Sequence, residues 1–292
     1  MRIFIRKMLS KVLSKEKKRK FKEVEYKIKK SLINKLPEIN EKNIKKILID
    51  DFKIKHGDHL FIHASLDMIN TQLSPLNILD ILLEIVGEEG SISAPTFIKY
   101  SSKDWMEMKE QFHIKKTPSG MGIFSERVRR HKQAQRSLHP TKSVATIGKI
   151  AHEILDEHHL DVYPFGEKSP FYKLMNDHNV KIIGLGAPMS YLSMVHTVED
   201  VYKEHYPLNV NEKNVYEKKC ISANDEVINV SSYVHNLSVL AKANPEKFVK
   251  KYMDSQDYIL FKYYLTDFFL VDGKKLYDML STQIELGNTI YD

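Results

Sequence analysis

The segment Ser193–Glu199 (SMVHTVE) contains the two residue types that most often remove a proton from a reacting group, a histidine and a carboxylate. His196 and Glu199 stand three positions apart, so a helix would place both side chains on one face. A neutral imidazole can accept a proton from an attacking amine, and a nearby carboxylate can fix its tautomer. We therefore predict that His196 is a general base and that Glu199 is its partner.

A metal site at this segment is not favoured by the sequence. Asp200 follows Glu199, so the H-x-x-E-H pattern of zinc enzymes is missing, and a third ligand is not evident. His-x-x-Glu pairs are also common on ordinary helix surfaces. We predict no metal, and the interpretation of the pair depends on the elements around it.

Two predicted strands end at positions where ligands commonly bind. The run 180–185 is apolar and is followed by Gly186, which is typical of a buried strand, and a loop then leads to His196. The strand at 59–63 runs into His63-Ala64-Ser65-Leu66, where backbone N–H groups and the Ser65 hydroxyl could hold a phosphate or a pantetheine amide. The alternative is that Ser65 caps a helix, and both roles are compatible.

A third cluster runs from Arg136 through Ser137, Leu138, His139 and Pro140, with Ser143 shortly after. An arginine with nearby hydroxyls suits the phosphates of a coenzyme through charge-assisted hydrogen bonds. A turn fixed by Pro140, with Arg136 in a salt bridge, is the alternative, and composition alone favours it.

Other catalytic chemistries are less well supported. A Ser-His-carboxylate hydrolase, with Ser65 or Ser193 as nucleophile, would lack the G-x-S-x-G turn. Cys220 lies in a predicted hairpin strand with no activating group in the sequence, and one cysteine allows no internal disulfide. The histidines at 152, 158 and 159 have acidic neighbours, which favours a solvated helix face over a metal site.

The elements predicted to position these residues alternate between strands and helices. We predict strands at 59–63, 91–94 and 180–185, helices at 76–86, 122–130, 148–158, 245–253 and 274–286, and a β-hairpin at 216–230. Such alternation in the first 200 residues predicts an α/β fold, a central β-sheet flanked by helices, and the hairpin predicts an additional α+β portion.

The net charge of +7 is concentrated in one tail. Residues 1–30 hold 13 Lys/Arg and 3 Asp/Glu, which leaves 32 basic and 35 acidic residues for the other 262. We therefore predict a basic helical N-terminal region at 1–50, followed by one domain at 51–292. The amphipathic residues between Ile3 and Leu13 allow peripheral membrane contact, although packing on the body is the favoured interpretation. No nucleic-acid-binding motif accompanies the charge, and the absence of a signal-peptide pattern favours the cytoplasm.

Taken in order, the motifs resemble those of the antibiotic N-acetyltransferase family, typified by aminoglycoside 3-N-acetyltransferases. They lie at 57–58 and 63–66, 94–97, 117–122, 136–143 with Gly148, 165–174, 184–186, and at His196 with Glu199 and Pro207. The resemblance implies an α/β fold and direct acyl transfer from acyl-CoA, which is acetyl-CoA or a larger thioester, without an acyl-enzyme. It also implies that His196 is the base, Glu199 its partner and Ser193 a contact to the thioester carbonyl. The implied coenzyme A contacts are His63, Ser65, Leu66, Arg136, Ser137, His139 and Ser143.

The acceptor amine is predicted from the loop before the base. Loop 187–195 (APMSYLSMV) has no acidic residue, whereas a polycationic antibiotic would favour carboxylates near the base. We therefore predict a nucleotide-linked amino-deoxysugar for a surface polysaccharide as the acceptor. The alternatives are aminoglycoside resistance and, in another class, a non-catalytic CoA- or sugar-binding protein. The oligomeric state is not predicted.

Overall fold

The fold was obtained as a computed structural model that describes residues 15–292, with the side chains of residues 15–19 and 22 outside the description. In this part of the chain a central sheet has seven strands. In sheet order they are β4 (Gln135–Arg136), β5 (Val144–Gly148), β2 (Ser91–Pro95), β1 (His59–Ala64), β6 (Lys181–Leu185), β10 (Thr266–Asp272) and β9 (Tyr258–Tyr263). Strands β2, β1 and β6 are parallel, and the strands beyond them pair antiparallel. The predicted α/β fold with a central sheet is confirmed.

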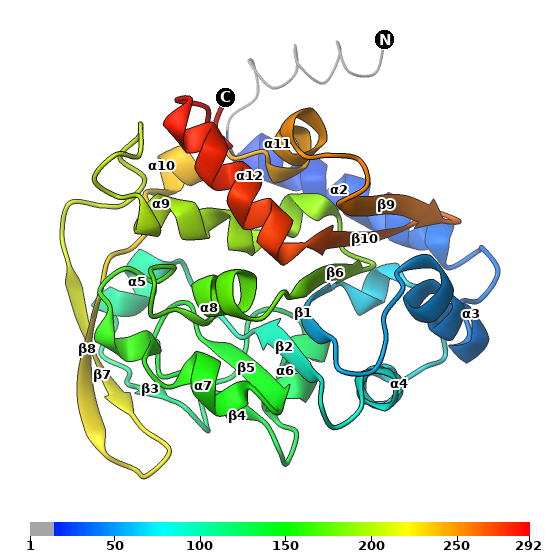
Figure 1. Ribbon diagram of the computed structural model, residues 1–292, viewed down its shortest axis with the longest axis horizontal. Coiled ribbons are helices and arrows are strands. Elements are labelled where there is room, and N and C mark those ends of the chain that lie inside the picture. Colours follow the sequence, from blue (N-terminus) through cyan, green and yellow to red (C-terminus); the bar gives the residue numbers. More distant parts are fainter. Residues whose placement is uncertain (1–14) are drawn as a thin grey trace.

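Helices cover both faces of this sheet (Figure 1). One face packs on α3 (Glu41–Lys46), α4 (Pro75–Val86) and α6 (Ile123–Arg129). The other packs on α7 (Ala151–Leu155), α8 (Pro170–Asp177), α11 (Pro245–Tyr252) and α12 (Gly273–Glu285). Because the central strands are buried on both faces, β1 and β6 are nearly continuous apolar runs, as the sequence predicted.

Local sequence signals explain where the helices begin. Ser74 caps α4 through a reciprocal pair of hydrogen bonds with Asn77, and Pro75 occupies the first turn. Ser169 accepts a hydrogen bond from the Tyr172 N–H at the start of α8 in the same way, again with a proline next. These caps satisfy backbone N–H groups that would otherwise lack partners at the starts of the two helices.

A smaller three-stranded sheet forms the additional α+β portion. It consists of β3 (Phe112–His113), β7 (Tyr216–Ile221) and β8 (Val227–Ser232), beside α5 (Ser102–Glu107). The β7–β8 hairpin lies at the side of the molecule (Figure 1). Its own core contains Trp105, Phe112, Cys220 and Val230. The predicted hairpin is confirmed, and Asp225 makes the turn with a φ of 62°.

The N-terminal region is helical where it is described, with α2 (Lys15–Ile33), α3 and the short helix at Ile47–Asp51. Ile44 and Leu48 are buried in the same core as the sheet residue Leu60. The predicted division at residue 50 stays a prediction, and the amphipathic stretch from Ile3 to Leu13 lies outside the described residues. Among the described helices, none combines the length and the apolar character needed to cross a bilayer.

The sequence missed five strands, of which β3 and β4 have only two residues each. The predicted helix at 148–158 begins at Ala151, because residues 144–148 form β5 and Gly148 ends it with a φ of 117°. The aromatic run at 258–269 forms β9 and most of β10, whose side chains fill both faces of the sheet. An apolar run of this length has no periodicity that separates strand from helix.

Candidate active site

The loop after β6 delivers the predicted base to the carboxyl end of the parallel strands. It passes through short helical turns at Met189–Tyr191 and Ser193–His196 and enters α9 (Thr197–Val201). Gly186 starts it with a φ of 69°, and a Cβ there would lie 2.5 Å from the Ser65 carbonyl oxygen. Only glycine allows the loop to leave β6 this close to the end of β1.

The predicted pair meets as expected. His196 Nδ1 lies 2.9 Å from Glu199 Oε1, and the Glu199 side chain is fully buried. The same Oε1 accepts a hydrogen bond from the Tyr291 hydroxyl at 2.8 Å, so a residue at the far end of the chain orients the carboxylate. If Nδ1 carries the proton that Glu199 accepts, the lone pair of His196 lies on Nε2.

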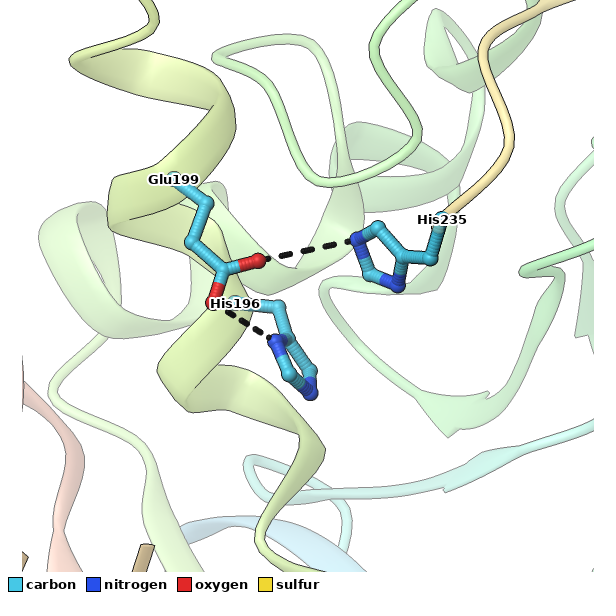
Figure 2. A group of neighbouring side chains, drawn as sticks. All are labelled: His196, Glu199 and His235. Atoms are coloured by element: carbon cyan, nitrogen blue, oxygen red, sulfur yellow. Dashed lines mark hydrogen bonds and ion pairs between the residues drawn. The ribbon is translucent and has the colours of Figure 1, made fainter. Parts of the chain in front are cut away.

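A second histidine faces the same carboxylate, and the sequence did not indicate it. His235 Nε2 lies 3.6 Å from Glu199 Oε2, opposite to the side that His196 approaches (Figure 2). Its ring stacks on Phe165 with centroids 5.6 Å apart. Burial, and next the neighbouring His196, hold the pKa of His235 well below its usual range, so it is neutral. His235 follows β8 of the smaller sheet, and no motif links it to residues 196–199.

His196, Glu199 and His235 each offer a ligand atom, and these atoms lie within 4.8 Å of one another. Two imidazoles and a carboxylate suit a divalent transition metal by chemistry. The hydrogen bonds of Glu199 to His196 and Tyr291 instead match a proton-transfer group. The predicted absence of a metal stays a prediction.

A cavity of about 590 Å³ lies at the ends of β1 and β2, and its lining includes His63, Ser65, Leu66 and Ser193. Phe97, Gly120, Gly122 and Tyr191 complete much of its wall. His63 Nε2 and Ser193 Oγ are buried, and neither has a hydrogen-bond partner among the described residues. Burial lowers the pKa of His63 to about 3, so its ring is neutral. The cavity therefore offers two unpaired polar atoms, and its mainly apolar wall also includes Ser65, Asp67 and Ser125.

The Ser65 hydroxyl is not a helix cap. Ser65 precedes the short helix at Leu66–Met68, but its side chain makes no capping hydrogen bond. Ser65 instead lines the cavity, together with His63 and Leu66.

The Arg136 cluster lies away from this cavity and bonds to the protein. The guanidinium donates to the carbonyl oxygens of Thr96, Ile114 and Thr117 and to the Ser143 hydroxyl. The remaining members of the cluster are also buried, and they are Ser137, Leu138, His139 and Ser143. Burial lowers the pKa of Arg136 to about 9. These contacts hold the loop that precedes β5, and the expected contact of Arg136, Ser137, His139 and Ser143 with coenzyme A stays a prediction.

Two minor expectations have clear outcomes. The solvated-face interpretation is wrong for His158, which is fully buried and hydrogen-bonded to Ser137 and to the Pro164 carbonyl oxygen. Cys220 is buried in β7, and burial raises the pKa of its thiol to about 12, so it is not a ready nucleophile.

With this geometry established, comparison with known proteins identifies the family. A family model described as aminoglycoside 3-N-acetyltransferase matches residues 61–280, three quarters of the chain. The chain belongs to this family. A curated member, aminoglycoside N(3)-acetyltransferase IX of Micromonospora chalcea, is 27% identical over 190 residues, which cover 57% of the chain and 66% of the relative. The type VIII enzyme of Streptomyces fradiae is 25% identical over 160 residues, covering 49% and 54%. The chain thus spans about half to two thirds of the length of these family members.

Solved structures of the family share the fold. A binary complex of AAC-IIIb with CoASH aligns with a TM-score of 0.68 at 18% identity, covering 85% of this chain and 97% of the other. AAC-VIa bound to sisomicin aligns with a TM-score of 0.69 at 20% identity, covering 86% and 98%. At these sequence identities the likeness shows a shared fold, and each alignment extends over most of both chains.

Proposed function

We propose that the protein transfers an acyl group from acyl-CoA to the amine of an amino sugar, with His196 as the general base. The observation that carries this proposal is the His196–Glu199 hydrogen bond at 2.9 Å, beside a cavity with unpaired polar atoms. Membership of an acetyltransferase family supports the reaction type. The aminoglycoside enzymes named above support an amino sugar as acceptor.

The chemistry of a direct transfer follows from this arrangement. The amine nitrogen attacks the thioester carbonyl carbon while His196 Nε2 accepts a proton from that nitrogen. The C–S bond then breaks, the sulfur leaves as the thiol of coenzyme A after taking up a proton, and an amide remains. Glu199 stabilises the imidazolium that forms for part of the cycle, because it accepts a hydrogen bond from Nδ1.

We infer that the cavity receives the pantetheine arm. Its mainly apolar wall suits the alkyl portions of such an arm, and Gly120 and Gly122 provide backbone without side-chain bulk. Ser193 Oγ is buried without a partner and lies in the same wall, three residues before the base. A hydroxyl at this place can donate to the thioester carbonyl oxygen as negative charge develops on it.

Two acceptor classes remain, and both are amino sugars. An aminoglycoside is favoured by the relatives, since each of the curated members named above is an aminoglycoside N(3)-acetyltransferase. A nucleotide-linked amino-deoxysugar is favoured by one feature of this chain, the loop 187–195 without acidic residues, which includes the exposed Tyr191 at the cavity.

The base assignment is tested with His196→Asn. General acid-base catalysis contributes about 10² to 10⁴ in rate, so we expect kcat to fall by at least about 100-fold while the KM for acetyl-CoA changes little. Thiol release from acetyl-CoA with each acceptor gives both constants. The exposed His205 provides the control His205→Asn, which should be unaffected. Full turnover by His196→Asn would show that another group takes the proton.

The acceptor class is tested with the unmodified protein. Sisomicin and a uridine-diphosphate-linked amino sugar are offered at equal concentrations, and the acetylated products are identified by mass spectrometry. Acetylation of sisomicin alone would decide for aminoglycosides. Absence of thiol release with every amine, together with measurable coenzyme A binding, would instead support the non-catalytic alternative.

A further inference from the structure

Lys142 is a charged residue of the site that neither the motifs nor the base assignment explains. It lies on the loop between β4 and β5, where His139 Nδ1 accepts the backbone N–H groups of Thr141 at 3.3 Å and Lys142 at 3.1 Å. The next residue, Ser143, donates to the Thr96 carbonyl oxygen. The backbone on both sides of Lys142 is therefore fixed, and the direction of its side chain is set by the fold.

The Lys142 ammonium lies close to two aromatic rings, one of which lines the cavity while the other is near the proposed base. It is 4.8 Å from the ring centroid of Phe97, which lines the cavity, and 5.8 Å from that of Phe165. The Phe165 ring is in turn 5.6 Å from the ring of His196. Glu199, the hydrogen-bond partner of His196, and Asp200 both interact electrostatically with this ammonium, so Lys142 belongs to the surroundings of the proposed base.

The ammonium is held without an oxygen partner. Lys142 is mostly buried, and among the described residues it has no hydrogen bond or ion pair, only the two aromatic rings. Burial lowers its pKa to about 8, and the nearby Asp200 and Glu199 carboxylates oppose that shift, so the charged form predominates at pH 7. Because no oxygen of the described residues holds this ammonium, it is available for a charge-assisted hydrogen bond to a ligand oxygen.

This charge changes what the site attracts. Glu199 and Asp200 are both buried near it, and without Lys142 the negative charge of Glu199, and of Asp200 in its ionised form, would favour a cationic acceptor. With Lys142 present that negative charge is offset, and each further ammonium of a polycation meets a like charge in a site of low dielectric. A phosphate ester gains a charge-assisted hydrogen bond from the same lysine.

We propose that Lys142 selects among acceptors by their charge. Its ammonium binds a phosphate group on the amino sugar and disfavours polycationic acceptors. This inference rests on the proposed function, because it places the acceptor beside His196. It assigns a specificity role to one residue of the Pro140–Ser143 turn and a chemical class, an amino-sugar phosphate, to the acceptor.

The test compares Lys142→Met with the wild-type chain. Methionine keeps an unbranched side chain against the two phenylalanine rings and removes the charge. Lys251→Met is the matched control, since Lys251 also lies over an aromatic ring, that of Tyr252 at 4.5 Å, but is exposed on α11. The acceptors are glucosamine 6-phosphate, glucosamine and sisomicin, with acetyl-CoA as donor. Lys142→Gln serves as a second neutral variant if the methionine variant does not fold.

We expect Lys142→Met to lose about tenfold or more in kcat/KM for glucosamine 6-phosphate, through KM, because a charge-assisted hydrogen bond is lost. Its kcat/KM should rise more for sisomicin, which carries several ammonium groups, than for glucosamine, which carries one, and the KM for acetyl-CoA should change little. Lys251→Met should match the wild type. An unchanged ratio of the phosphorylated to the unphosphorylated sugar in Lys142→Met would overturn the proposal.

Binding measurements separate this inference from the proposed function. Calorimetric titration of glucosamine 6-phosphate and glucosamine into the wild type and Lys142→Met, with coenzyme A present, needs no turnover. If no amine is acetylated but the phosphate preference exists and is lost in Lys142→Met, the proposed function fails and Lys142 keeps its role. If both sugars bind equally to both proteins, the role of Lys142 fails whether or not acetylation occurs.

Discussion

Glu199 is contacted by three other residues of the candidate site. One of its oxygens accepts from both His196 and Tyr291, and the other faces His235. A buried carboxylate needs several donors, because a charge with too few hydrogen bonds is costly in a low dielectric. Tyr291 therefore orients this carboxylate in addition to packing against the core. Burial, and then the adjacent Glu199, raise the pKa of its hydroxyl, so the hydroxyl keeps its proton and donates at neutral pH.

The contribution of Tyr291 is measurable with Tyr291→Phe. A hydrogen bond to a charged group contributes about 1.5–3 kcal/mol, and its loss leaves the Glu199 carboxylate less firmly oriented toward His196. We expect kcat to fall about tenfold with little change in the KM for acetyl-CoA, as measured by thiol release. The exposed Tyr264 provides the control Tyr264→Phe. Equal kcat values for the two variants would remove Tyr291 from the set that supports the base.

At the scale of elements, the site depends on how closely the loop after β6 approaches the end of β1. Gly186 makes this approach with a positive φ, and its hydrogen faces the Ser65 carbonyl oxygen. Ser65 itself donates its N–H to the Leu185 carbonyl oxygen at 2.9 Å, which joins the two strand ends. The base and the cavity wall are thus held together through a contact between two loops.

Gly186→Ala tests this contact against a built-in reference. Both Gly186 and Gly57 have a positive φ, but a Cβ on Gly57 meets nothing within 4 Å, whereas one on Gly186 lies 2.5 Å from the Ser65 oxygen. Gly57→Ala should cost only the backbone strain, about 1 kcal/mol, and Gly186→Ala should cost more and also reduce kcat. Urea unfolding and thiol release measure both effects. Equal losses of stability in the two variants would show that the loop moves aside without strain.

The whole molecule buries several neutral histidines. Within the described residues, burial lowers the pKa of His63 and of His158 to about 3 and holds those of His139 and His235 well below the usual range. The unfolded chain protonates these rings near pH 6.5 and the folded one does not, so below that pH the unfolded state binds more protons. Asp200 acts in the opposite direction, since burial raises its pKa to about 7, but it is one group against four.

We therefore expect stability to fall as the pH drops below about 6.5. Once its unfolded form is protonated, each neutral histidine lowers the free energy of unfolding by about 1.4 kcal/mol for each unit that the pH falls. The net effect of a few such groups is comparable to the total stability of a typical domain. Urea unfolding at pH 7.5, 6.5 and 5.5 should give free energies of unfolding that decrease in that order. A free energy at pH 5.5 equal to or above that at pH 7.5 would contradict this expectation.

The sequence by itself determined the features that depend on local spacing. His196 and Glu199 share one face because helical geometry places residues three apart side by side. The strands β1 and β6, the helix α4 and the β7–β8 hairpin were predicted because apolar runs, caps and turn residues act over a few neighbours. The order of motifs along the chain, rather than any one of them, also indicated the family that the comparisons then identified.

Only the tertiary structure decided which distant residues join that local pair. His235 and Tyr291 reach Glu199 from 36 and 92 positions away, and the Lys142 ammonium lies 5.8 Å from the ring centroid of Phe165. The donors of the Arg136 guanidinium go to protein carbonyl oxygens that the fold brings to it, and its expected contact with coenzyme A stays a prediction. Contacts of this kind depend on strand order and on burial. Neither leaves a periodic signal in the sequence, because the packing of a side chain is set by the whole core rather than by its neighbours along the chain.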